Sequence, residues 1–333
     1  MSEIRSPKDL PFFYILSMGR SGSTLLEFLL DAHPNVNIPL ESRFIIHLFS
    51  KYEQKTNWSL NDKLQFVQDL FQDEKLSKFW NLDRSKLETA ITEGPSNLSF
   101  FEMCRIVTAH YPSFFTKTDI AIQGSKNPIY ALWADVLHEL NQSNKYIHLV
   151  RNPLGVIASH KKLGRQNLYY FAYRWNLMNR KIERLKSKVP DQFITIRYEA
   201  LIEQPEKELV QVCDFLNISY QPDQLQFHEK IAEIKAMIDP EREKEKLALF
   251  ESHLKNLVHP IDKKAGESWQ NTLSEQEIRG VSFITKKLAK SYVYNVGEEQ
   301  GNFQFRFISA KFKVWSKYIQ TRLYYNRSMS LKK

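Results

Sequence analysis

The chain has 333 residues, of which 42% are hydrophobic and 26% are charged, and its net charge is +9 at pH 7. This composition is ordinary for a globular protein and excludes a fibrous or low-complexity chain. The length suits one large domain with insertions or two smaller domains. Summed positive charge favours an anionic ligand or surface. We expect no nucleic-acid partner, because no recognisable nucleic-acid-binding motif accompanies the charge.

The first predicted element is a buried strand in the apolar, aromatic run 11–17. A loop of small residues follows at 18–24, and a helix is predicted over 25–30. Strand, glycine loop and helix in this order are typical of the start of a nucleotide-binding βαβ unit.

The next stretch, 45–120, mixes aromatic and charged residues with few β-branched runs, which predicts several helices. We interpret 46–119 as a helical insertion that could form a lid or face an acceptor. Further on, strands at 120–123, 146–150 and 193–196 alternate with helices that end at Leu140 or cover 154–162, 168–188 and 206–216. This alternation predicts an α/β fold with a parallel sheet covered on both faces.

The chain beyond about 221 is mostly polar and helical in pattern. We predict a single domain over 1–285 and a helical, basic C-terminal extension over 286–333. Aromatic and basic residues gather in 302–327. They fit either a helix packed on the domain or a basic amphipathic surface for peripheral membrane or partner contact.

The two cysteines and the N-terminal residues indicate in which cellular compartment the protein is expected. Cys104 and Cys213 lie far apart and have no metal-ligand spacing around them, so we expect buried free thiols and no metal site. The first ten residues are charged, and the apolar run 12–18 is too short to span a bilayer. We therefore expect a cytoplasmic protein without an export signal or membrane anchor.

The loop at 19–24 has the chemistry of an anion site. Its glycines permit close backbone approach, and free N–H groups at a helix start attract an anion. Arg20 adds a guanidinium that can contact two phosphate oxygens. A Walker A loop needs Lys after its last glycine, but Ser23 follows Gly22 here, which disfavours ATP or GTP hydrolysis. A glycine loop that only turns the chain is the alternative.

A second anion site is predicted at the end of the third strand. Arg151 follows that strand directly, where ligands bind in open α/β sheets, and Ser159 lies eight residues later on the next helix. A cation and a hydroxyl suit a phosphate monoester. A surface Arg and an unrelated helix Ser are the alternative. Together the two sites fit one ligand with two phosphate ends.

The motifs resemble those of sulfotransferases that use 3′-phosphoadenosine 5′-phosphosulfate (PAPS). Residues 13–26 resemble the family's 5′-phosphosulfate loop, and 149–160 resemble its 3′-phosphate motif. Residues 30–34 and 41–43 are similar to the protein-tyrosine branch and its bacterial relatives. Leu163 stands where that branch has an Arg. The resemblance implies a P-loop-type three-layer fold, PAPS as donor, 3′-phosphoadenosine 5′-phosphate (PAP) as product, and no metal.

The resemblance also implies binding roles. The 5′-phosphosulfate is expected at Arg20, Ser21, Gly22, Ser23 and Thr24, and the 3′-phosphate at Arg151 and Ser159. Tyr198 resembles a family Tyr near the adenosine, although a core Tyr is equally compatible. The family's C-terminal loop often has Lys before Pro; His259 stands there, and Lys263 or Lys264 could supply the charge.

Catalytic roles follow from the same likeness. Glu41 falls at the catalytic base of the protein-tyrosine branch, and we expect a partly buried carboxylate with a raised pKa. Lys126 is expected in a loop after a strand, as the acid or leaving-group stabiliser, and Arg43 could orient the acceptor. The alternatives are a surface pair of Glu41 with Arg43 and an exposed loop Lys. Rival bases are His33, His47 and His160.

The sequence therefore predicts an enzyme that moves a sulfuryl group from PAPS to an acceptor hydroxyl on a sugar, lipid, small metabolite or tyrosine. The alternatives are a P-loop nucleotide kinase or NTPase, and a non-catalytic protein that binds PAP or another nucleotide. The resemblance is also compatible with a homodimer, because family members often dimerise.

Overall fold

The computed structural model describes residues 9–241 and 243–297. Its centre is a sheet in the order β2-β3-β1-β4-β5, in which every neighbouring pair is parallel. The strands are β1 (Phe12–Leu16), β2 (Val36–Asn37), β3 (Ile122–Lys126), β4 (Lys145–Val150) and β5 (Phe193–Arg197). The predicted α/β fold with a parallel sheet is confirmed. The short edge strand β2 was not predicted.

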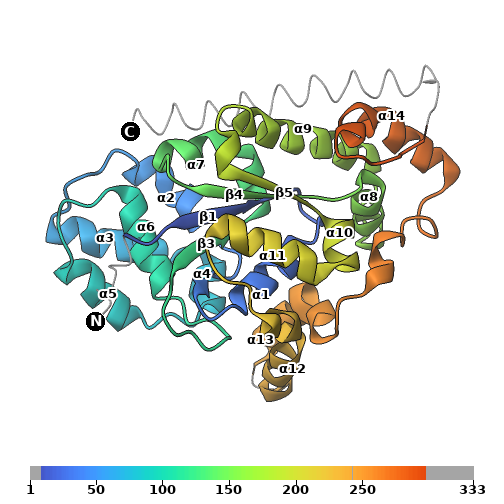
Figure 1. Ribbon diagram of the computed structural model, residues 1–333. Helices are drawn as coiled ribbons and strands as arrows, with labels where there is room; N and C mark the ends of the chain where they lie inside the picture. The colour runs from blue at the N-terminus through green and yellow to red at the C-terminus, as the bar shows by residue number, and fades with distance from the viewer. Residues whose placement is uncertain (1–8, 242, 298–333) are drawn as a thin grey trace.

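Helices cover both faces of this sheet (Figure 1). Those before β3 are α1 (Ser23–Asp31), α2 (Phe44–Tyr52), α3 (Leu60–Leu70), α4 (Glu74–Phe79), α5 (Arg84–Glu93) and α6 (Phe100–Ala109). Those between β3 and β5 are α7 (Ala134–Leu140), α8 (Pro153–Lys162) and α9 (Leu168–Lys186). Those after β5 are α10 (Tyr198–Glu203), α11 (Pro205–Leu216), α12 (Phe227–Met237), α13 (Lys244–Leu249) and α14 (Glu275–Ser291).

The alternation of side chains along β1 separates two apolar clusters. Phe12, Tyr14 and Leu16 belong to the cluster beneath α7, α8 and α9, whereas Phe13 and Ile15 belong to the cluster that includes α1 and α11. Successive side chains of a strand point to opposite faces, so a strand buried on both sides reads as a continuous apolar run. Figure 1 shows α7 and α9 on one side of the sheet and α1 and α11 on the other.

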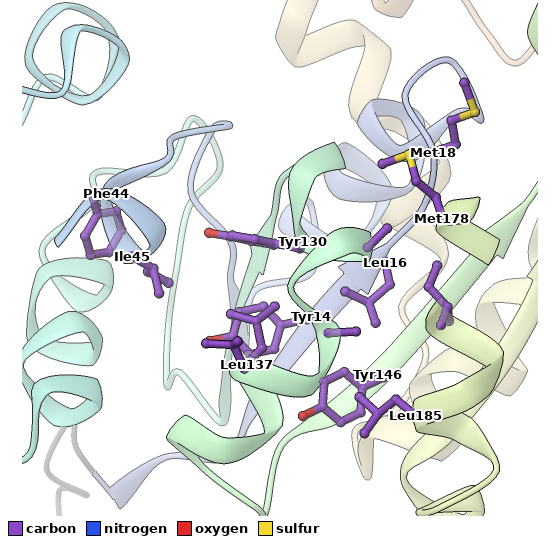
Figure 2. Close-up of a cluster of buried hydrophobic side chains, with 14 of the residues drawn as sticks. Tyr14, Leu16, Met18, Phe44, Ile45, Tyr130, Leu137, Tyr146, Met178 and Leu185 are labelled. Carbon is purple, nitrogen blue, oxygen red and sulfur yellow. The ribbon is translucent and has the colours of Figure 1, made fainter. Parts of the chain in front are cut away.

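Three tyrosine rings pack together in the apolar cluster beneath α7, α8 and α9 (Figure 2). The ring of Tyr14 lies edge-on to Tyr130, with centroids 5.4 Å apart, and is stacked on Tyr146 at 6.1 Å. Aromatic pairs in these arrangements add to the stability that comes from apolar burial. This packing fixes β1 and therefore the loop that follows it.

The end of β3 differs from the sequence prediction. We predicted a strand at 120–123 and a loop at 124–128, but β3 continues to Lys126. This boundary prediction is wrong because residues 124–126 pair with β1, and sheet pairing outweighs the turn-like composition of Gly124-Ser-Lys. A Cβ on Gly124 would lie 2.4 Å from Phe13 Cζ, so glycine is needed where the aromatic ring covers the strand.

The structure also bears on the predicted insertion, the domain boundary and the two cysteines. The segment 46–119 forms most of α2 and all of α3 to α6. The boundary proposed at 285 falls inside α14, and residues 298–333, with their aromatic and basic segment, lie outside the described residues. Cys104 and Cys213 are buried free thiols, as predicted. Within the described ranges, every helix is too short or too polar to cross a bilayer.

Candidate active site

The loop between β1 and α1 has a conformation that suits an anion. Gly22 precedes the first residue of α1 and has φ +91°, and Arg20 has φ +75°. Glycine is required at position 22, because a Cβ there would lie 2.3 Å from Cδ2 of Tyr198. The ring of Tyr198, the first residue of α10, therefore lies directly against the loop.

The two segments predicted to bind anions are separated in sequence but meet at this loop. Arg20 Nε donates to Ser159 Oγ at 2.9 Å, and Arg151 Nη1 donates to the Arg20 carbonyl at 3.1 Å. Arg151 directly follows β4 and Ser159 lies on α8, so both belong to the carboxyl edge of the sheet. The structure thus brings the two predicted sites into one place.

Arg151 is held firmly and still has hydrogen-bonding capacity. Its side chain is buried, its Nη2 donates to the Ala265 carbonyl at 2.9 Å, and its guanidinium lies 4.2 Å from the centroid of the Tyr198 ring. Its buried Nε has no protein partner among the described residues. Burial and the neighbouring Arg151 both lower the pKa of Arg20. The two adjacent guanidiniums concentrate positive charge at this loop.

A cavity of about 440 Å³ opens at these residues. Of the predicted binding residues, those that line it are Arg20, Gly22, Ser23, Thr24, Arg151, Ser159, Tyr198 and His259. Ser21 is buried and Lys263 is exposed, and neither lines the cavity. Sequence reasoning missed its apolar walls, which include Ile202, Phe227 and Leu257. These three come from segments whose apolar residues resemble any other core residues in sequence.

A second, smaller cavity adjoins the first through Thr24, which lines both. Its walls include Lys126, Glu41 and Glu27. Lys126 Nζ lies 2.8 Å from Glu27 Oε2 and 3.4 Å from Glu41 Oε2. Glu41 also accepts a hydrogen bond from Lys75 Nζ at 2.8 Å. Lys126 is therefore a buried ammonium between two carboxylates, not an exposed loop residue.

The alternation of side chains along β3 explains why Lys126 faces α1. Ile122 packs in the cluster on the α1 side, and Lys126, four residues later, faces the same side of the strand. Its Nζ also donates to Thr24 Oγ1, on α1, at 3.3 Å. Sequence reasoning missed Glu27, although a single carboxylate in the apolar run 25–30 was a usable signal of a buried charge.

The pKa directions in this cluster differ from expectation. Burial raises the pKa of Glu27 to about 7. Burial would also raise the pKa of Glu41, but the ammonium groups of Lys126 and Lys75 outweigh it, and the pKa is lowered. The expected raised pKa of Glu41 is therefore wrong, because two cations stabilise its ionised form. Burial would lower the pKa of Lys126, yet Glu27 and Glu41 raise it, so the ammonium stays charged.

The other sequence candidates lie elsewhere. Arg43 is exposed at the start of α2 and lines neither of these two cavities. His33 Nε2 bonds the Ser219 carbonyl at 2.7 Å, which is a structural role. His160 stacks on Phe171 at 3.9 Å, and burial together with nearby arginines lowers its pKa to about 4. His47 is exposed and lies 3.6 Å from Asp73. None of these three histidines lines either cavity.

A parallel α/β sheet with a glycine-containing loop between its first strand and first helix defines a P-loop-type fold. The model of the sulfotransferase family matches residues 11–222. The chain belongs to this family and is a sulfotransferase enzyme.

Relatives and solved structures agree with this assignment. The chain is 24% identical to protein-tyrosine sulfotransferase 1 of Danio rerio, over 85% of this chain and 72% of the relative. It is similar to the sulfotransferase domain from the curacin biosynthetic pathway, with TM-score 0.57, 25% identity, and coverage of 86% and 99%. The sulfotransferase domain of the Synechococcus PCC 7002 olefin synthase has TM-score 0.55, 23% identity, and coverage of 89% and 99%.

Proposed function

We propose that this sulfotransferase uses PAPS as its donor and transfers the sulfuryl group in line to an acceptor hydroxyl. One observation carries the proposal: a single cavity holds both arginines and continues, through Thr24, to Lys126 and Glu41. A donor with phosphate groups on both the 3′ and the 5′ oxygen of its ribose needs two cationic sites, with the sulfuryl group beside a general base.

The residues present fit such a donor. The cavity volume of about 440 Å³ lies in the range of roughly 300–1,000 Å³ that small-molecule sites occupy. The guanidinium of Arg151 and the Ser159 hydroxyl would bind the 3′-phosphate. The loop at 20–24 would bind the 5′-phosphosulfate through backbone N–H groups and hydroxyls. The apolar walls at Ile202, Phe227 and Leu257 suit the adenine ring.

Each catalytic residue has a distinct part in this proposal. Glu41 takes the proton of the acceptor hydroxyl as its oxygen forms the new bond to sulfur. The bond between sulfur and the bridging oxygen breaks, and its electron pair leaves with PAP. Lys126 stabilises the charge that develops on that leaving phosphate. Positioning and electrostatics supply most of the rate enhancement, as they do in phosphoryl transfer.

The lowered pKa of Glu41 has two opposing effects on its role as a base. The carboxylate is ionised throughout the neutral range, so it is always available to accept a proton. A lower pKa also makes it a weaker base, since proton-transfer driving force follows basicity. The acceptor must therefore lie within hydrogen-bond reach of Glu41 to compensate.

The proposal is tested by binding and turnover measured together. Calorimetry should show tight binding of PAP and much weaker binding of ATP with Mg²⁺. Incubation with PAPS and a panel of alcohols, sugars and tyrosine peptides, read by mass spectrometry, should show an added sulfate, unchanged by EDTA. Turnover of ATP in place of PAPS would favour a kinase or NTPase, and PAP binding without any transfer would favour a non-catalytic protein.

A further inference from the structure

A third cavity, of about 220 Å³, adjoins the small cavity around Glu41. It shares three lining residues with the small cavity around Glu41: Leu40, Phe79 and Leu254. The three cavities therefore follow one another, with Thr24 joining the first two and these apolar residues joining the last two.

The walls of this third cavity are overwhelmingly apolar. Eight of its ten lining residues are hydrophobic, and the two polar ones are Asn81 and Glu243. Among those lining residues there is no Lys, Arg or His, so the wall offers no cation to an anionic acceptor. A carboxylate at Glu243 would repel one. A sugar would lose most of its hydrogen bonds to water without replacements, which costs free energy.

The residues that form the cavity come from distant parts of the chain. Phe79 ends α4 and Phe114 lies after α6, whereas Ile234 lies on α12 and Phe250 begins the π-helical turn Phe250–Leu254. Ile234, Phe250 and Leu254 also lie beyond residues 11–222, the stretch that the family model matches. The cavity is therefore built partly from residues outside the matched stretch.

We infer that the acceptor is an uncharged, predominantly apolar alcohol whose hydroxyl lies at Glu41 and whose hydrocarbon part fills the cavity bounded by Phe79, Ile234 and Phe250. This inference rests on the proposed sulfuryl transfer and narrows its acceptor to one chemical class. The Leu40, Phe79 and Leu254 side chains form the passage between hydroxyl and hydrocarbon.

A homologous series of primary alcohols, from butanol to decanol, tests the inference on the unmodified protein with PAPS. Each added methylene that enters the cavity should raise kcat/KM about three- to fourfold until the cavity is full. A value of kcat/KM that does not change with chain length would overturn the inference. So would a sugar or a tyrosine-containing peptide with a higher kcat/KM than the best alcohol.

A matched pair of variants locates the effect. Ile234→Trp fills the cavity and should lower kcat/KM for octanol at least tenfold while changing that for butanol less than twofold. Ala232→Trp introduces the same ring at an exposed position on the same helix and should change neither. Equal losses in both variants, or equal losses for both alcohols, would contradict the placement. Thermal unfolding of each variant checks that it is folded.

Equilibrium binding separates this inference from the function on which it rests. Calorimetry of octanol into PAP-saturated protein should show binding that Ile234→Trp abolishes and Ala232→Trp retains. If PAP itself does not bind, the proposed donor is wrong. If PAP binds and octanol does not, the donor stands and the apolar acceptor is wrong.

Discussion

The ammonium of Lys126 and the carboxylate of Glu27 lie 2.8 Å apart between β3 and α1, with 3% and 2% of their side chains exposed. Two ions so deeply buried are each costly alone, and each compensates the other. Glu41 lies on the far side of the same ammonium at 3.4 Å. The ammonium of Lys126 is therefore shared by two carboxylates, Glu27 on α1 and Glu41.

Replacing Glu27 by Gln should change how stability depends on pH. The pKa of Glu27 is raised from 4.5 to about 7, so the folded state binds its proton more tightly than the unfolded state. That contribution to stability is fully present below about pH 4.5 and is lost as pH rises to about 7. The free energy of unfolding of Glu27→Gln, relative to wild type, should therefore increase across this window.

Urea denaturation at several pH values between 4 and 8 measures this difference. Glu229→Gln, an exposed change on α12, is the control for losing one carboxylate. Parallel curves for wild type and Glu27→Gln would show that Glu27 does not titrate in this window.

Replacing Glu41 by Gln should abolish most turnover while leaving nucleotide binding intact. Loss of a general base lowers kcat by about 10²–10⁴. The Glu41 side chain lines the small cavity and not the 440 Å³ cavity proposed to hold the nucleotide. The dissociation constant of PAP should therefore stay within about twofold. Steady-state kinetics and calorimetry together decide the matter; full activity in Glu41→Gln would remove Glu41 from the mechanism.

Replacing Lys75 by Met should make Glu41 a stronger base. Although burial would raise the pKa of Glu41, Lys126 and Lys75 together lower it, so removal of Lys75 should raise it. The acidic limb of kcat/KM against pH should move to higher pH. The control is Lys78→Met, which removes an exposed lysine from the last turn of the same helix, α4. Coincident pH profiles would mean that Lys75 does not act on the catalytic proton.

Replacing Ser159 by Ala should weaken PAP more than 5′-AMP. The hydroxyl accepts from Arg20 Nε at 2.9 Å and lines the nucleotide cavity. Loss of a hydrogen bond to a charged group costs about 1.5–3 kcal/mol, which corresponds to roughly 10–150-fold in the dissociation constant. Calorimetry with both nucleotides measures it, and Ser291→Ala, exposed at the end of α14, is the control. Equal weakening of both nucleotides would place the 3′-phosphate elsewhere.

Replacing Gly22 by Ala should combine backbone strain with a clash. The position has φ +91°, and the added Cβ would meet Tyr198 Cδ2 at 2.3 Å. Gly164→Ala is the matched control, since φ is +73° there and nothing lies within 4 Å of the added Cβ. Strain alone costs on the order of 1–3 kcal/mol.

Chemical denaturation should thus find Gly22→Ala less stable than Gly164→Ala. Adding Tyr198→Ala to Gly22→Ala should recover the part that comes from the clash, because contacting residues couple in a double-mutant cycle. Additive effects of the two substitutions would mean that the ring does not constrain the loop.

Much of the architecture and of the anion site was predictable because its signals are local. The apolar run of β1, the glycine loop and the start of α1 are adjacent in sequence. Arg151 directly follows a strand, and parallel strands bring their carboxyl ends to one edge. These local patterns and the rule for parallel sheets predicted that the loop and Arg151 lie at one edge, whereas the hydrogen bond between Arg20 and Ser159 emerged only from the structure.

The chemistry of the catalytic cluster depended on tertiary structure. Turn-like composition predicted a loop at Lys126, yet pairing with β1 made it a buried strand end. The pKa of Glu41 is lowered by Lys75 and Lys126, which lie 34 and 85 residues away in sequence. Local sequence does not encode which charges become neighbours.

The sequence alone determined most strands of the parallel sheet, the glycine loop after the first strand and the family motifs. Each of these depends on residues close together in the chain. Only the tertiary structure decided that Glu27 shares the ammonium of Lys126 and that α4, α12 and the turn at Phe250 enclose an apolar cavity beside Glu41. The physical reason is that burial, ion pairing and cavity shape arise from contacts between distant segments, which no local preference specifies.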